Sequence, residues 1–516
     1  MTRPAARRNF VLGVGGAVVL LAALDAYVIT TILITVVGDL GIPVNHLERA
    51  TPIITGFLLG YVAAMPLLGQ LSDRFGRKPL LHGCLAVFGI GSITTALAHG
   101  IPLLVTGRAV QGIAGGALLP ITMALAGDLW AERERPVVLG AVGAAQELGS
   151  VLGPLYGAGI AATALGWRGI FWINVPLVIA AMIAVQLTVP KETSAHTGAR
   201  VDIVGGILLA AGLSLLVIGL YNPDAEKSAL PSWGPPLLAA GVVALIVFGF
   251  WERRSPVKLL DLSGVRKASL FATLGVSLLA GSALMATLWA VQLVVQTLQE
   301  KSAVDGAVAL TWFLVTLVVA AVLGGLLARR IGERWTVVGG MAVAAAGYLL
   351  ISNWPVHADT VSYAGVPRMD VDLMVAGLGL GLVIAPVSAA VLRSVPAAQH
   401  GVASAAVVVA RMMGMLLGVA GLSAWGFYRF QSLAGKLKMP LPFNVKQAVY
   451  NKQVAVYKAA LQDALHTEYS EIFLITAILC ALGAVIGLLL RDDRPLAEDR
   501  ATPMAESGHV VRPEMR

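Results

Sequence analysis

The stretch that decides the fold is residues 69–81, GQLSDRFGRKPLL, a polar step between two long apolar segments. Gly69 lets two helices approach closely, because it has no side chain. Asp73 is a carboxylate beside a helix end, where it can bond backbone donors. Three basic residues follow, and they are expected to place fixed positive charge at one face of a membrane: Arg74, Arg77 and Lys78.

The composition is that of a membrane protein. Of the 516 residues, 57% are apolar and 13% are charged, and the mean hydropathy is +0.81. A soluble protein of this length could not cover its surface with so few charges. The net charge of +8 therefore indicates basic loops on one side of a membrane and not nucleic-acid binding. The predicted fold is an all-α polytopic membrane protein.

The sequence lacks the motifs of several common kinds of functional site. Cys84 and Cys480 fall in apolar runs and form no CxxC pair, and the histidines are scattered without zinc-ligand spacing. No histidine has an aspartate five residues later, as a common acyltransferase motif requires, and no P-loop for ATP is found. We therefore expect no metal, no cofactor and no enzymatic activity.

The long apolar runs predict fourteen membrane spans, and an internal repeat divides them into two related halves. Residues 325–334 resemble residues 69–78, but the second copy lacks the aspartate, so the role of that charge is expected in the first half only. Basic residues gather in alternate loops, which places both termini in the cytoplasm. The expected organisation is a six-helix bundle at 1–190, two linker transmembrane helices at 203–252, a second six-helix bundle at 268–491 with a periplasmic extension at 429–469, and a cytoplasmic tail at 492–516.

The loop pattern G-x-L-S-D-R-x-G-R-K-x-x-L resembles the loop signature of the major facilitator superfamily. Residues 108–116, RAVQGIAGG, resemble the fourth-span signature of proton-coupled facilitators. The fifth span resembles the antiporter motif and departs from it only at Ala158, where a second glycine is usual; the matching residues are Gly149, Gly153, Pro154 and Gly157. The resemblance implies two six-helix bundles with the substrate bound between them.

Narrower features resemble one branch of that superfamily. Leu24-Asp25 and residues 167–176, WRGIFWINVP, are similar to the fourteen-span drug:proton antiporters. Within that branch, residues 61–69 and Glu147 look most like the mycobacterial triacylglyceride exporters of the inner membrane. This resemblance implies a lipid substrate, proton coupling and a periplasmic lipid-carrying lipoprotein as partner.

Charged residues inside membrane spans are costly and are therefore candidates for the mechanism. Asp25 and Glu147 are predicted to couple transport to protons, with Arg108 and Arg411 as intramembrane charge partners. The alternative for each carboxylate is a static buried ion pair that positions helices. A conformational latch is predicted at Gly69, Asp73, Arg74, Gly76, Arg77 and Lys78. Cavity residues are predicted at Gln111, Gln292 and Gln296. The alternative for Gln292 and Gln296 is that they form hydrogen bonds with neighbouring helices.

Two periplasmic features are unusual for a transporter. Val445 to Ser470 contains no proline or glycine, so a helix is predicted to run unbroken from about 445 to 490, unless its first part lies flat on the membrane. Residues 363–367, YAGVP, predict a turn in a small hairpin. These features favour a proton-coupled lipid exporter over the alternative, a multidrug:proton antiporter of the same fold. A membrane-bound lipid enzyme and a non-transporting scaffold for a lipoprotein are the other rivals.

Overall fold

The computed structural model describes residues 3–130, 135–190, 201–225, 228–256, 267–356, 358, 361–363, 365–394, 400–440 and 446–490. Over these residues the chain is almost entirely helical, and the strands form a single short hairpin. The tail predicted at 492–516 lies outside the described residues.

Among the described residues, fourteen helices are long and apolar enough to cross a membrane, in agreement with the predicted number of spans. Two short segments accompany them: η1 (Val44–Ala50) precedes α2, and the π-helical η2 (Val294–Leu298) continues α9. The long helices are α1 (Arg3–Asp39), α2 (Thr51–Phe75), α3 (Arg77–Ala96), α4 (Ile101–Leu129), α5 (Arg135–Ala161), α6 (Gly166–Thr188), α7 (Ile203–Leu220), α8 (Gly234–Arg254), α9 (Lys267–Leu293), α10 (Ala303–Ile331), α11 (Glu333–Ser352), α12 (Arg368–Ser394), α13 (His400–Ala434) and α14 (Gln447–Gly487).

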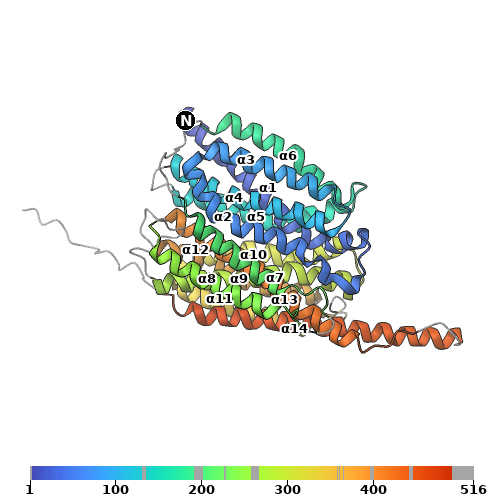
Figure 1. The fold of residues 1–516 in the computed structure, drawn as a ribbon. Helices are drawn as coiled ribbons and strands as arrows, with labels where there is room; N and C mark the ends of the chain where they lie inside the picture. The colour runs from blue at the N-terminus through green and yellow to red at the C-terminus, as the bar shows by residue number, and fades with distance from the viewer. Residues whose placement is uncertain are drawn as a thin grey trace, which may run out of the picture.

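The helices form two six-helix bundles, α1–α6 and α9–α14, joined by the pair α7 and α8 (Figure 1). Equivalent helices of the two bundles make equivalent contacts: α1 packs on α5 as α9 packs on α13, and α2 packs on α4 as α10 packs on α12. This correspondence follows from the internal repeat. The linker helices pack on each other, and α7 also contacts α2 and α13. The pair therefore covers one side of the interface between the bundles, which we call the seam.

Turns distinguish the two ends of the molecule. At one end, which we call the glycine-turn face, Gly76 joins α2 to α3 with φ 91° and Gly332 joins α10 to α11 with φ 92°. A residue with a side chain would be strained at either φ. At the opposite end, the hairpin face, β1 (Ser362–Tyr363) pairs antiparallel with β2 (Val366–Pro367), so the predicted hairpin is confirmed.

Helix α14 is longer than a membrane requires. Its 41 residues span about 62 Å at ~1.5 Å per residue, roughly twice the ~30 Å of a hydrocarbon core. The first part of the helix extends beyond the rest of the molecule (Figure 1, red). His466 Nε2 contacts the carbonyl oxygen of Trp354 at 2.5 Å, which fixes the base of the extension beside the end of α11. The predicted unbroken helix is confirmed from Gln447 to Gly487.

Candidate functional site

A cavity of about 1780 Å³ lies in the seam and reaches toward the glycine-turn face. It is lined by the parts of α2, α4, α5, α9, α10, α12 and α13 nearest that face, and by residues of α7 and α8. Its volume exceeds the roughly 300–1,000 Å³ of ordinary small-molecule pockets. Most lining residues are apolar. Two of the charged lining residues, Glu147 and Arg411, lie well inside their helices, and the others lie toward helix ends: Arg77, Asp128, Glu252 and Arg253.

Glu147 and Arg411 join the two bundles in the depth of the cavity. Glu147 lies midway along α5 and Arg411 lies in the first half of α13, and Nη2 of Arg411 donates to Oε1 of Glu147. The Glu147 side chain is 21% exposed and that of Arg411 is 11% exposed. Nε of Arg411 has no hydrogen-bond partner. Because the ion pair spans the seam beside a cavity, protonation of Glu147 would break a contact between the two bundles.

Asp25 has a different environment from Glu147, because it is buried within the first bundle. Its Oδ2 accepts from Nη1 of Arg108 at 2.5 Å, and its Oδ1 accepts from Nδ2 of Asn174 at 2.8 Å and Nε2 of Gln111 at 3.2 Å. The Arg108 guanidinium also lies over the Phe57 ring, 4.1 Å from its centroid. Asp25 and Arg108 therefore form a buried ion pair that Gln111 of α4 and Asn174 of α6 also bond. The structure thus places Arg108 against Asp25 and Arg411 against Glu147.

The antiporter-motif glycines bring α5 against α1. A Cβ atom built on Gly149 would lie 2.2 Å from Cβ of Ala23, and one built on Gly157 would lie 2.5 Å from a methyl group of Val28. Gly153 leaves similarly little room beside Tyr27, and Pro154 lies inside the helix. These contacts hold α5, which carries Glu147, directly on α1, which carries Asp25.

The loop signature fixes helix ends at the glycine-turn face. Nε of Arg77 donates to Oδ2 of Asp128 at 3.2 Å, and Nζ of Lys78 donates to the carbonyl oxygens of Gln186 and Val189 at 2.7 and 2.9 Å. Gly69 lies against Pro120 of α4, and Arg74 is exposed beside Phe75. The backbone of Asp73 lies in α2, but its side chain is outside the described part of the structure.

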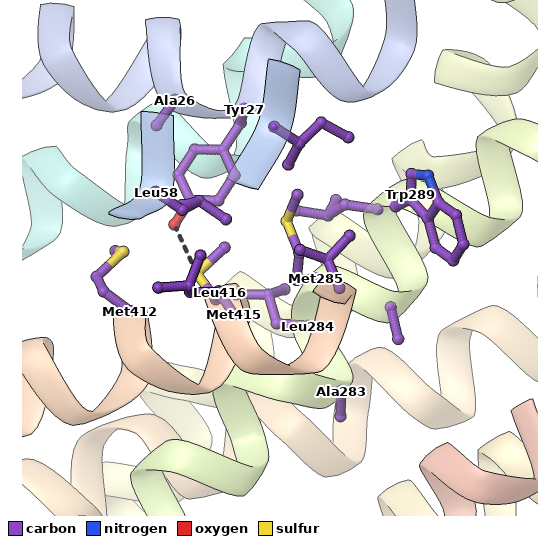
Figure 2. Close-up of a cluster of buried hydrophobic side chains, with 14 of the residues drawn as sticks. Ala26, Tyr27, Leu58, Ala283, Leu284, Met285, Trp289, Met412, Met415 and Leu416 are labelled. Carbon is purple, nitrogen blue, oxygen red and sulfur yellow. Dashed lines mark hydrogen bonds between the residues drawn. The ribbon is translucent and has the colours of Figure 1, made fainter. Parts of the chain in front are cut away.

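The seam is closed at the hairpin face. Tyr27 of α1 donates from its hydroxyl to Sδ of Met415 at 3.6 Å, within a cluster that includes Leu58, Met285 and Leu416 (Figure 2). Nearby, α9 meets α1 through two glutamines. Nε2 of Gln292 donates to Oγ1 of Thr31, and Nε2 of Gln296 donates to its carbonyl oxygen, both at 3.2 Å.

These contacts correct one prediction from the sequence. Gln111, Gln292 and Gln296 were expected to line the cavity, and none of them is among its lining residues. Gln111 donates to Oδ1 of Asp25. Gln292 and Gln296 donate to Thr31 on the closed side of the seam. A glutamine inside a span must bond wherever a partner lies, and the sequence does not reveal that partner.

Sequence reasoning also missed several charged residues at helix ends and in the seam. Asp128, Glu333 and Arg393 form ion pairs at the glycine-turn face. Glu48 and Glu468 are buried at the hairpin face. Each lies close to the end of an apolar run, where a charge is ordinarily solvated, so nothing in its position along the chain singles it out. Among the described residues, no group of three or more histidine, cysteine, aspartate or glutamate side chains is placed to hold a metal ion.

Comparison with known proteins gives consistent results. The family model described as Major Facilitator Superfamily matches residues 16–419 and also 301–514. The chain is 50% identical over 503 residues to a triacylglyceride transporter of Mycobacterium tuberculosis strain H37Rv, covering 96% of each chain. It is 47% identical over 498 residues to a triacylglyceride transporter of Mycolicibacterium smegmatis, covering 95% of this chain and 89% of that protein.

Solved structures show the same fold at low identity. A bacterial homologue of the human lysosomal transporter Spinster, inward-facing and occupied, aligns with a TM-score of 0.63 at 13% identity, covering 95% of this chain and 97% of that one. The human organic anion transporter MFSD10 (TETRAN) aligns with a TM-score of 0.53 at 18% identity, covering 92% and 99%. At these identities the likeness concerns the fold alone.

Proposed function

Because the chain belongs to the major facilitator superfamily, we propose that it is a proton-coupled secondary transporter that moves triacylglyceride out of the inner membrane toward the periplasm. The observation that carries the proposal is the large, mostly apolar cavity of the seam with a single ion pair, Glu147–Arg411, in its depth. The relatives named triacylglyceride transporters support the choice of cargo.

The cavity suits a lipid better than a polar solute. Leu148 of α5 and Val318 and Val322 of α10 line it and are 46%, 43% and 65% exposed. Exposed apolar side chains in a cavity favour apolar cargo, because acyl chains there displace water. A volume above the ordinary range for small-molecule pockets also favours a multi-chain lipid over a single drug molecule.

The direction of transport follows from the placement of the two faces. The basic loop residues predict that the glycine-turn face lies in the cytoplasm. The described conformation is then inward-facing, with the hairpin face closed by the Tyr27–Met415 contact and the Thr31 bridges. In this proposal the loop signature at residues 69–78 is a latch that regulates opening at the cytoplasmic side. Within it, Arg77 pairs with Asp128 of α4.

Glu147 is the principal proton carrier in this proposal. Its exposure to the cavity allows a proton to reach it, and its loss of charge would free Arg411 of the opposite bundle. Asp25 accepts hydrogen bonds from Arg108, Gln111 and Asn174 in this conformation. Release of these donors would require α1, α4 and α6 to separate, so the proposed coupling role of Asp25 belongs to another step of the cycle.

The α14 extension has a role at the end of the transport path. It projects from the hairpin face, which is periplasmic in this orientation, and its length lets one helix continue from the bilayer into the periplasm (Figure 1). A lipid leaving the membrane needs an apolar surface there. A periplasmic lipid-carrying lipoprotein is the partner that would receive it.

Reconstitution into proteoliposomes tests this function. Purified protein is inserted into liposomes that contain labelled triacylglyceride, a pH gradient is imposed, and both transfer to an acceptor and proton flux are followed. We expect gradient-dependent lipid transfer with accompanying proton movement. Proton flux driven by amphipathic drugs but not by lipid would instead favour the multidrug antiporter, and lipid transfer without proton flux would remove the coupling.

A further inference from the structure

Two buried carboxylates lie near each other across the seam at the closed hairpin face. Glu48 belongs to η1 beside the first bundle and is 3% exposed, and Glu468 belongs to α14 of the second bundle and is 2% exposed. They lie close enough for the charge of Glu48 to repel that of Glu468. Neither belongs to the cavity that holds Glu147.

Both carboxyl groups converge on one turn of α13. Glu48 lines a small cavity together with Ser423 and Phe427 of that helix. Glu468 contacts the same turn: a Cβ atom built on Gly426 would lie 3.0 Å from its Oε1. The missing side chain of Gly426 therefore leaves the room that the Glu468 carboxyl group occupies.

Each carboxyl group has one oxygen without a hydrogen-bond donor. Oε1 of Glu48 is 2.9 Å from Nδ1 of His46, but its Oε2 has no partner, and Oε1 of Glu468 has none either. Buried acceptors are almost always satisfied, and two carboxylates that repel each other in an apolar interface cannot both remain ionised. A proton on the pair removes one charge and supplies the missing O–H donor.

Other ionisable groups among the described residues surround the pair. On the first-bundle side these are His46, bonded to Glu48, and the exposed Arg49. At the end of α7, Tyr221 lines the small cavity. On α14, Tyr469 shares a hydrogen bond with Oγ1 of Thr297 at 2.7 Å. Between α13 and α14, Arg429 donates to Glu471 at 2.7 Å.

We propose that Glu48 and Glu468 bind one proton between them, and that this proton holds the hairpin face of the seam closed. Loss of the proton leaves two like charges across the interface, which drives the bundles apart at that face. The orientation rests on the proposed function: the proton enters from periplasmic water when the face is open and returns to the same water. It is therefore a gate proton, separate from the proton carried by Glu147.

The gate has a direction that fits an exporter. An acidic periplasm protonates the pair and favours the inward-facing conformation, in which the cavity is ready to take up lipid. The pair thus senses the outer pH without adding to the number of protons moved per lipid.

Labelling of a buried cysteine tests the gate. Ala420 of α13 lines the small cavity and is 4% exposed, so Ala420→Cys should react with a membrane-impermeant maleimide only when the hairpin face opens. Val361→Cys, at a position 39% exposed, corrects for the pH dependence of the reagent. The native Cys84 and Cys480 are both buried. All variants carry Glu147→Gln, so the cavity carboxyl group does not contribute.

We expect the corrected labelling rate to rise with pH by up to about tenfold per pH unit, as the loss of one proton predicts. Glu48→Gln and Glu468→Gln should each stay slowly labelled at every pH, because the amide keeps a donor and carries no charge. Glu471→Gln, one turn along α14, is the matched control and should keep the full dependence. An unchanged pH dependence in both glutamine variants, or none in the parent, would overturn the proposal.

A second measurement needs no substitution at the pair. Infrared spectra of the full chain should show a carboxylic acid stretching band that disappears over the same pH range as the labelling change. Absence of a titrating band would also overturn the proposal. Neither measurement uses lipid or a pH gradient. A failure of the proposed gate can therefore be distinguished from a failure of the proposed lipid transport in liposomes.

Discussion

Arg77 and Glu333 occupy equivalent positions in the two bundles and carry opposite charges. Arg77 is the first residue of α3 and pairs with Asp128 near the end of α4 at 3.2 Å. Glu333 is the first residue of α11 and pairs with Arg393 near the end of α12 at 2.8 Å. The repeat has kept the ion pair and reversed its sign.

The second loop copy lacks the aspartate but still carries an ion pair. Glu333 at a helix start and Arg393 near a helix end both agree with the helix dipoles, whereas Arg77 and Asp128 oppose them. The first pair is nevertheless the more buried of the two: its side chains are 7% and 26% exposed, against 4% for Glu333 and 49% for Arg393.

A double-mutant cycle compares the two pairs through alanine substitutions. We expect a coupling free energy of about 1–3 kcal/mol for Arg77 and Asp128, and about 0.2–1 kcal/mol for Glu333 and Arg393, since water screens the exposed arginine. Unfolding in mixed micelles measures both. A larger coupling in the second pair would show that dipole alignment outweighs burial.

Gly149→Ala should separate α5 from α1, because its Cβ atom would lie 2.2 Å from that of Ala23. We expect a destabilisation of about 1–3 kcal/mol, as for other overpacked contacts. Gly159→Ala on the same helix meets nothing within 4 Å and should be neutral, or stabilising by up to about 1 kcal/mol. Thermal unfolding of the two variants distinguishes a packing effect from a general intolerance of α5 to alanine.

Glu147→Gln should abolish proton-coupled lipid transfer and leave the protein folded. The side chain lies in a cavity, so the uncharged amide is tolerated, but it carries no proton through the cycle. Proton flux and lipid transfer in proteoliposomes are the measurements, with Glu471→Gln as the control for loss of a carboxylate. Wild-type flux in Glu147→Gln would exclude this residue from the proton path.

Asp25→Asn should cost more stability than Glu147→Gln, because it leaves the Arg108 charge unpaired in a fully buried site. Removal of one partner of a buried pair costs about 3–5 kcal/mol. The double variant Asp25→Asn/Arg108→Met should recover much of that loss without recovering coupled transport. If Asp25→Asn and Glu147→Gln unfold at the same temperature, the ion pair of Asp25 and Arg108 does not stabilise the fold more than that of Glu147 and Arg411.

Shortening of the α14 extension should stop lipid release and spare folding. Replacement of residues 436–461 by a short flexible linker removes the projecting part but keeps His466 on the carbonyl oxygen of Trp354. Lipid bound to the purified protein should persist while transfer to an acceptor falls at least tenfold. Normal transfer by the shortened chain would mean that the extension has another purpose.

The fold class, the number of spans, the repeat and the helical extension could all be predicted from the amino-acid sequence. Those properties depend on apolar runs about 20 residues long, on loop charge and on motif residues, all of which are local in the chain. The sequence also selected Asp25, Arg108, Glu147 and Arg411, because any charge inside a span is conspicuous.

The pairing of the charged side chains could not be predicted in this way and depends on how the helices pack. The tertiary structure joined Asp25 to Arg108 within one bundle and Glu147 to Arg411 across the seam, and the two pairs are therefore assigned different roles. It also sent Gln292 to Thr31 and brought Glu48 near Glu468. A residue's electrostatic partner depends on how distant helices rotate and pack, and periodicity along a single helix carries no information about its neighbour.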